Sequence, residues 1–227
     1  MAYFIAENLK QIFDAVSIDV SFSCEKGTMT SIVGASGSGK STVLRLISGL
    51  NKACKEQKLV LDGVDVNALP PAKREIGMVF QSHTLFDHLK VEDNVAYGLI
   101  SGGMKKKEAR KQAADFLKQF ELEGFEKRYP DTLSGGEKQR VSLARTLIMK
   151  PKLVLFDEPL SALDAPLRKK LAALIRSLQQ TFGFTGIMVT HDINEAKAVS
   201  DQIILMKKGH IIWQGKACDF DEKMMVD

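Results

Sequence analysis

A glycine-rich segment near the start of the chain has the residue types needed to bind a phosphate chain. It fits the pattern G-x-x-x-x-G-K-[ST] and continues with Thr42; its residues are Gly34, Ala35, Ser36, Gly37, Ser38, Gly39, Lys40 and Ser41. The glycines let the backbone curl so that successive N–H groups point at one phosphate chain, and a following helix adds its positive dipole end. Lys40 would face the β- and γ-phosphates, and the Ser41 hydroxyl would be an oxygen ligand for Mg²⁺. The alternative is a strand-to-helix turn without a ligand.

A second segment, residues 133–140, predicts another helix start that could meet an anion. Ser134 and Glu137 form an S-x-x-E capping box, a motif that most often serves only its own helix. Gly135 and Gly136 follow the cap, although glycine is costly in a helix. Their benefit would be an uncovered backbone at the positive end of the helix dipole. The chain therefore offers two candidate anion sites.

Two acidic residues follow an apolar segment in the last third of the chain. Residues 153–156 are apolar throughout, as in a strand buried on both faces, and Asp157 and Glu158 come directly after them. Phosphoryl transfer to water needs a metal ion and a positioned nucleophile beside the phosphates. An isolated Asp-Glu pair could be ordinary surface, but beside a phosphate loop we favour a role in the chemistry.

The elements that would position these residues alternate between strands and helices. We expect strands at 17–22, 29–33, 76–80, 153–156 and 186–189, a hairpin at 59–66 with a two-residue primed turn, and a terminal hairpin at 202–213. We expect helices at 40–50, 91–100, 105–120, 135–149 and 193–199, and one with its apolar face at Leu167, Leu171, Leu174, Ile175 and Leu178. This order predicts a largely parallel α/β sheet, into which the helical middle third is inserted.

Composition excludes several other classes of protein. The chain has 227 residues, 44% of them hydrophobic, 26% of them charged, and a net charge of +4. The basic residues are scattered apart from the run at 105–107, so we expect no nucleic-acid partner. Cys24, Cys54 and Cys218 have no ligand spacing and read as reduced thiols. We expect no secretory leader, and no segment reaches the roughly 18 apolar residues of a membrane span.

Residues 133–140 closely resemble the signature sequence of ABC ATPases, and the other motifs of that family follow in order. Gln81 stands at a strand end, residues 153–158 resemble the Walker B strand, residues 161–164 resemble the D-loop, and His191 matches the switch histidine. Residues 157–164 look most like importers of the polyamine, ferric-iron, thiamine, molybdate and sugar group. The resemblance covers nearly the whole chain. It implies one ABC ATPase domain over 1–227, with a P-loop NTPase (RecA-like) core at 1–81 and 151–227, an antiparallel β subdomain and a helical subdomain at 82–150.

The resemblance also implies cofactors and a role for each residue, with ATP and Mg²⁺ as the cofactors. Lys40, Glu158 and His191 would be catalytic, with Glu158 as the general base for water and His191 donating to the γ-phosphate. The metal would be held by Ser41, Gln81 and Asp157, while Phe13 would stack on adenine. Ser134, Gly135, Gly136 and Gln139 would cover ATP bound by a second chain, to which Asp164 of the D-loop would also cross.

The implied partners are a second ATPase subunit, two transmembrane permease subunits and, indirectly, a solute-binding protein. The expected location is peripheral, on the cytoplasmic face of the bacterial inner membrane. Residues 82–94, with Leu85, Phe86 and Leu89, would receive a permease coupling helix, unless those side chains are ordinary core. The chain ends soon after Trp213, so we expect no C-terminal regulatory domain and no clue to the cargo.

Two other functions stay open for the sequence. One is a soluble ABC ATPase in DNA repair or translation, although those proteins commonly carry two cassettes or a long coiled-coil insertion. The other is an export cassette, which would more typically have a different triplet after the Asp-Glu-Pro at 157–159. Copurification with membrane permeases would separate the importer from the soluble ATPase.

Overall fold

One sheet runs through the molecule. The computed structural model describes residues 2–12, 17–51, 56–82 and 84–225. Over these residues the sheet has 10 strands in the order β5-β4-β1-β2-β10-β9-β3-β8-β7-β6. The strands are β1 Ala2–Ile12, β2 Ser17–Glu25, β3 Met29–Val33, β4 Lys58–Leu61, β5 Val64–Asp65, β6 Ile76–Val79, β7 Leu153–Asp157, β8 Thr185–Val189, β9 Gln202–Lys207 and β10 His210–Lys216.

One half of the sheet is parallel. Strands β9, β3, β8, β7 and β6 pair in parallel with one another, and every residue of β3, β7 and β8 is buried. Such strands are apolar on both faces because each face is covered by other elements. In β7, Val154 and Phe156 join one hydrophobic core while Leu153 and Leu155 join another. The expected mostly parallel α/β sheet is thereby confirmed.

The other half of the sheet is mostly antiparallel and contains a strand that we did not expect. Strand β1 pairs antiparallel with both β2 and β4. Its buried residues Phe4 and Ala6 alternate, but the next, Leu9, is three positions further on. A register shift lies between Ala6 and Leu9, where Asn8 has a φ of 54°. This bulge breaks the period of two by which a strand is recognised in a sequence.

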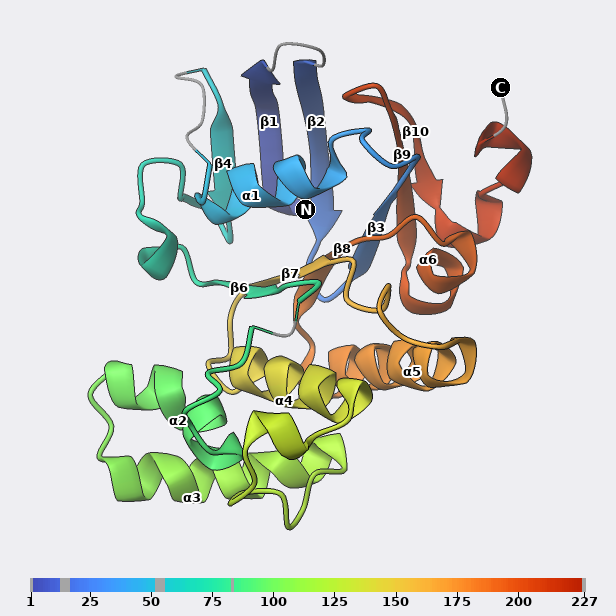
Figure 1. Ribbon diagram of the computed structural model, residues 1–227. Helices are drawn as coiled ribbons and strands as arrows, with labels where there is room; N and C mark the ends of the chain where they lie inside the picture. Colours follow the sequence, from blue (N-terminus) through green and yellow to red (C-terminus); the bar gives the residue numbers. More distant parts are fainter. Residues whose placement is uncertain (1, 13–16, 52–55, 83, 226–227) are drawn as a thin grey trace.

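The helices divide between the two faces of the sheet (Figure 1). They are α1 Lys40–Ser48, α2 Val91–Ser101, α3 Lys106–Leu117, α4 Gly135–Leu147, α5 Ala165–Phe182 and α6 Ile193–Val199. Helix α1 packs with one core, whereas α2, α3, α4 and α5 pack with the other, on the opposite face. Helices α2, α3 and α4 form a group beside the sheet, as expected for a helical insertion; the boundaries at residues 82 and 150 stay a prediction. No described helix has the length and apolar character needed to cross a bilayer.

The carboxyl end of α1 is fixed by a buried arginine. Arg74 is 5% exposed, and its guanidinium donates to the carbonyl oxygens of Leu46 and Ile47 at the last turn. Gly49 follows the helix in the left-handed conformation, with a φ of 80°. A left-handed glycine and a cation near the last carbonyls both stop a helix. The helix therefore ends at Ser48, two residues before the end expected from the sequence.

The β4–β5 hairpin has the expected primed turn. Asp62 and Gly63 have φ angles of 51° and 76°, and β4 pairs antiparallel with β5 directly on either side of them. Positive φ at both central residues defines a type I′ turn, whose twist matches that of the strands. This hairpin forms the far edge of the antiparallel half of the sheet.

Candidate nucleotide-binding site

The glycine-rich segment is a tight loop between β3 and α1. Gly34, Gly37 and Gly39 all have positive φ, at 153°, 78° and 99°. A β-carbon on Gly34 would overlap the carbonyl oxygen of Met206, and one on Gly39 would lie 2.9 Å from Cδ1 of Ile18. The loop therefore needs glycine at both positions for conformation and for space. The amide of Gly209, in the β9–β10 turn, donates to the carbonyl of Ser38 at 3.1 Å and holds the loop from outside.

Lys40 lies at the centre of this loop. Its Nζ donates to the carbonyl oxygens of Gly34 and Ala35, both at 2.9 Å, and the residue is 4% exposed. Burial lowers the pKa of Lys40, while the charges of Glu158 and Asp157 oppose that shift. Nζ also donates to the Ser38 hydroxyl at 3.5 Å. A buried ammonium group that donates to uncharged oxygens is well suited to a phosphate oxygen, because the anion would neutralise its charge.

The loop is bonded directly to the acidic end of β7. The Ser41 hydroxyl donates to Oδ1 of Asp157 at 2.6 Å, although the two residues are 116 positions apart. Asp157 is 8% exposed at the last position of β7. One hydroxyl and one carboxylate at this distance are hard oxygen donors of the kind that Mg²⁺ accepts together with phosphate oxygens and water. The residues present therefore fit a magnesium ion.

Glu158 and His191 face each other beside that pair. Glu158 has a φ of 45°, and its amide donates to the carbonyl of Val189 at 3.1 Å. Its Oε2 lies 3.3 Å from Nδ1 of His191, which follows β8. Left-handed backbone is uncommon in a residue with a β-carbon and is concentrated at functional sites. The turn after β7 thus directs the Glu158 carboxylate toward the loop that carries His191.

For three other residues that we expected to contact the nucleotide or the metal, the structure gives only the position in the fold, or nothing. Gln81 is exposed two residues after the end of β6, the strand that pairs with β7. Thr42 is partly buried in the first turn of α1. Phe13, the expected adenine contact, lies outside the described residues. Its role stays a prediction.

The capping box at the start of α4 is confirmed. Ser134 Oγ accepts from the Glu137 amide at 3.4 Å, and the Ser134 amide donates to Oε2 of Glu137 at 2.7 Å. The bond from the Ser134 amide, and a second from the Ser134 hydroxyl to the same carboxylate oxygen, lower the pKa of Glu137. Ser134 and Gly135 are exposed, but Gly136 is buried. Gln139 is fully buried as well, so Ser134 and Gly135 are the members of this group that form an open helix start.

Gly136 has a packing role that the sequence did not indicate. A β-carbon there would lie 2.8 Å from Cδ2 of Leu167 on α5, whereas one on Gly135 would find its nearest neighbour at 3.8 Å. The second glycine therefore lets α4 approach α5 closely. Gly135 has no such packing constraint. Packing therefore does not explain the glycine at this position, and an exposed backbone that a ligand could approach remains the expected reason.

The turn that follows Glu158 leads into α5. Asp164 caps that helix by accepting from the Leu167 amide at 2.9 Å, and Pro166 stands in the first turn. Ser161 Oγ donates to the Glu158 carbonyl at 3.0 Å and closes the turn. Asp164 itself is exposed.

The site has neighbours that the sequence did not suggest. The phosphate loop borders a cavity of about 270 Å³, also lined by Ile212, Met224 and Met225. On the other side of the site, Arg168 contacts Asp192, the residue after His191, at 3.3 Å. Residues that are far apart in the chain leave no local sequence pattern that would predict their contact. Only a prediction of the strand order could have indicated that they lie close together.

Comparison with known proteins agrees with this geometry. The family model described as ABC transporter matches residues 18–161. An Fe(3+) ions import ATP-binding protein FbpC of Agrobacterium fabrum is 47% identical over 93% of this chain and 60% of its own length. The protein of the same description in Rhizobium etli is 48% identical, over 92% and 60%. The chain thus spans about three fifths of the length of these curated relatives.

Solved structures show the same fold. CbiO1 of Clostridium perfringens, part of an ABC transporter complex, superposes with a TM-score of 0.84 at 28% identity, over 95% of this chain and 89% of that one. A dimer of the ATP-binding cassette MJ0796 in a post-hydrolysis state with ADP and Pi superposes with a TM-score of 0.81 at 35% identity, over 96% of this chain and 100% of that one.

The two glycines after Ser134 give a matched pair of substitutions. Gly136→Val should lower the free energy of unfolding by about 1–3 kcal/mol, because the added methyl groups overpack the contact with Leu167. Gly135→Ala should have no such cost, because its surroundings are open and alanine favours the helix. Urea unfolding followed by circular dichroism measures both.

A second substitution isolates the contact itself. If space beside Leu167 is the constraint, Leu167→Ala should recover part of the stability lost in Gly136→Val. A double variant as unstable as the sum of the two single variants would contradict the packing role.

Proposed function

The chain belongs to the ABC transporter family, and we propose that it is the ATP-binding and ATP-hydrolysing subunit of an ABC importer. The observation that carries the proposal is the bond from Ser41 to Asp157, with the facing Glu158 and His191 beside it. A phosphate loop alone could serve binding only. A phosphate loop joined to a metal-binding carboxylate, with a second carboxylate next to it, has the parts that hydrolysis requires.

The binding step would use the phosphate loop, three candidate metal ligands and an aromatic contact. The loop amides and the amino end of α1 would meet the phosphate chain, and Lys40 would exchange its carbonyl partners for phosphate oxygens. Ser41, Asp157 and Gln81 would hold Mg²⁺, which would supply neutralisation of charge between the β- and γ-phosphates. Phe13 would stack on the adenine.

The hydrolytic step would use the two residues that face each other. Glu158 would accept a proton from the attacking water, since a carboxylate within hydrogen-bond reach of the nucleophile can act as a general base. His191, whose Nδ1 is 3.3 Å from that carboxylate, would orient it and donate to the γ-phosphate. Their closeness supports the proposal that both act at one γ-phosphate, Glu158 on the attacking water and His191 on a phosphate oxygen.

We propose that a second copy of an ATPase subunit completes the site. The open helix start at Ser134 belongs to α4, and the phosphate loop starts α1, on the opposite face of the sheet. One chain cannot then present both to the same phosphate without a large rearrangement. In a head-to-tail pair, Ser134 and Gly135 of one copy would cover ATP bound at Lys40 of the other, with Asp164 crossing to the same site. Gly136 and Gln139 would support that surface from beneath, since both are buried.

The relatives favour a role in import over the alternatives, which are an export cassette and a soluble ATPase in DNA repair or translation. The FbpC proteins are described as Fe(3+) import subunits, and ferric iron is therefore the first cargo to test for this chain. We propose that it docks on two transmembrane permease subunits, served indirectly by a solute-binding protein. It would lie peripherally on the cytoplasmic face of the bacterial inner membrane.

The docking surface that we propose centres on Phe86 and Tyr97. Their ring centroids are 4.6 Å apart, and the Arg145 guanidinium lies 5.3 Å from that of Phe86. The Asn94 side chain fixes the loop by bonding to the Phe86 amide at 2.8 Å. Tyr97 is 48% exposed, whereas Leu85 packs against the core. Tyr97 is accordingly the better probe of docking.

The chemical proposal separates binding from turnover. Glu158→Gln should keep ATP binding and lose about 10²–10⁴-fold in turnover, because the amide cannot accept the proton from water. Lys40→Ala should lose nucleotide binding itself, since the ammonium at the loop centre is gone. Equilibrium binding of a fluorescent ATP analogue and phosphate release measure the two steps. Phosphate release by Glu158→Gln at the wild-type rate would show that Glu158 is not the base.

The docking proposal can be tested on assembly. Tyr97→Asp should leave the ATPase rate of the isolated subunit unchanged and abolish copurification with permease subunits from the same cell membrane, because a charge would enter the apolar contact. Val64→Asp is the matched control: Val64 is 52% exposed on β5, in another part of the molecule, and the variant should still assemble. Normal assembly of Tyr97→Asp, or equal loss in both variants, would rule out this surface.

A further inference from the structure

Arg168, in the first turn of α5, contacts two segments of the site at once. Its Nη2 donates to the carbonyl of Leu163 at 3.0 Å, at the end of the turn that begins with Glu158. Its Nη1 lies 3.3 Å from Oδ2 of Asp192, and its Nε lies 3.4 Å from Oε1 of Glu195. The guanidinium therefore joins the turn after β7 to the segment after β8.

The segment after β8 is built around His191. Asp192 caps α6 by accepting from the Asn194 amide at 2.8 Å. The Thr190 hydroxyl donates to Oε2 of Glu195 at 2.7 Å and accepts from the Asp192 amide at 3.0 Å. The residues on either side of His191 are thus fixed to the start of α6, whereas the His191 side chain itself is 58% exposed.

Charge explains why Arg168 is needed at this position. Burial raises the pKa of Glu195, and the negative charge of Asp192 adds to that effect. The bond from Thr190 and the charge of Arg168 act in the opposite direction. Without the guanidinium, two neighbouring carboxylates, one of them 8% exposed in its side chain, would repel each other at the start of α6. The start of α6 is the part of the structure to which the residues on either side of His191 are bonded.

We propose that Arg168 is a positioning residue for hydrolysis, which holds the His191 segment against the turn of residues 158–164. The two segments meet at one end through Glu158 and His191, 3.3 Å apart, and at the other through Arg168. Arg168 touches no reacting atom; it acts by keeping His191 within reach of Glu158. The inference rests on the proposed ATPase function and adds to it a residue outside the family motifs.

Removal of the guanidinium should affect turnover and not binding. Arg168→Met keeps the unbranched apolar stem of the side chain and removes the guanidinium. We expect kcat to fall about 10–100-fold, because small displacements of reacting groups are costly, while the affinity for ATP is unchanged. Arg168→Lys keeps the charge but cannot reach all three partners in the same geometry, so kcat should lie between those of the Met variant and the wild type.

The decisive comparison combines the change with loss of the histidine. If Arg168 acts through His191, Arg168→Met should cause little further loss of kcat in a His191→Ala background. A residue that only stabilises the fold would cause the same loss in both backgrounds. Should Arg168→Met not fold, as judged by thermal unfolding, Arg168→Lys enters the same comparison in its place.

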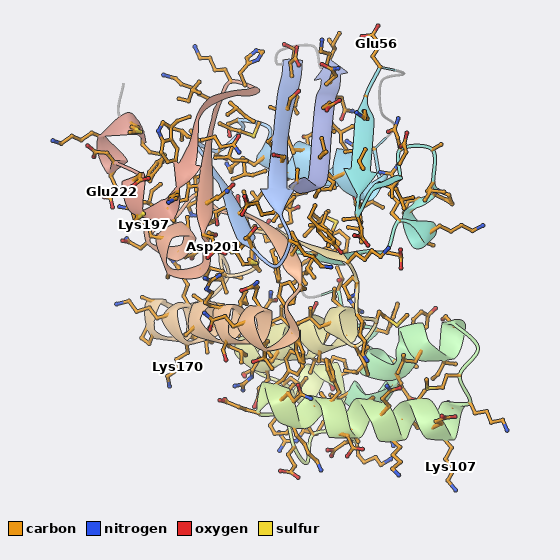
Figure 2. All side chains as sticks on the ribbon, turned by 180° about the vertical axis from the view of Figure 1, so that it is seen from behind. Glu56, Lys107, Lys170, Lys197, Asp201 and Glu222 are labelled. Atoms are coloured by element: carbon orange, nitrogen blue, oxygen red, sulfur yellow. The ribbon has the colours of Figure 1, made fainter. Side chains whose placement is uncertain are left out.

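The same helix offers a matched control. Arg176 also lies on α5 and forms a paired contact, 2.6 Å from Oδ1 of Asp201. Figure 2 shows Asp201 on the sheet side of α5, whereas Lys170 extends from the opposite, solvent side of the helix. Arg176→Met removes an arginine of similar exposure whose contacts in the described part of the chain are with Gln179 and Asp201, away from the His191 segment, so it should lower stability but leave kcat unchanged.

Three outcomes are distinguishable. The inference is supported by a kcat loss in Arg168→Met that disappears in the His191→Ala background and is absent from Arg176→Met. It is overturned by wild-type kcat in Arg168→Met, or by an undiminished loss in the His191→Ala background. Absence of ATPase activity in the wild-type protein with Mg²⁺ and ATP would instead overturn the proposed function and, with it, this inference.

Discussion

The hydrogen bond from the Ser41 hydroxyl to the Asp157 carboxylate links two segments that meet because β3 and β7 flank β8 in the parallel part of the sheet. Parallel neighbours end at the same edge, so the loops after β3, β8, β7 and β6 lie side by side there. Those loops carry the phosphate loop, His191, the acidic pair and Gln81. The chemistry we propose depends on this strand order, because no two of the four segments are close in the sequence.

The same sheet separates the two helix starts that could meet a phosphate. Helix α1 packs in the core on one face, and α4 packs in the core on the other. Gly136 lets α4 pack closely against Leu167 of α5, and the capping box satisfies the backbone groups at the start of α4. This start is exposed and lies on the face of the sheet opposite α1, so it is suited to meeting another subunit, and the structural likeness to a dimeric cassette agrees with that arrangement.

Sequence patterns located most of the elements and most of the motifs, because hydrophobic periodicity and the residues that begin or end an element are local features of the chain. They missed β1, whose bulge at Asn8 breaks the alternation. They could not show that Gly136 and Gln139 are buried, since this depends on how α4 packs. Nor could they find the contacts of Arg168, which join residues brought together by the strand order. The motifs therefore indicated which residues we propose for the chemistry, and the fold adds the residues that contact them.

The central claim is that one ATP site is built from two copies of an ATPase subunit, and mixed dimers test it most directly. Lys40→Ala protein is mixed with Ser134→Arg protein, both in a Glu158→Gln background so that hydrolysis does not empty the site, and trapped nucleotide is counted. Each protein alone should trap none, because every site carries a defect. The mixed dimer has one site with an intact loop and an intact helix start, and the account predicts that it traps nucleotide. If mixed dimers form but trap no more nucleotide than the separate proteins, the two helix starts do not share a site.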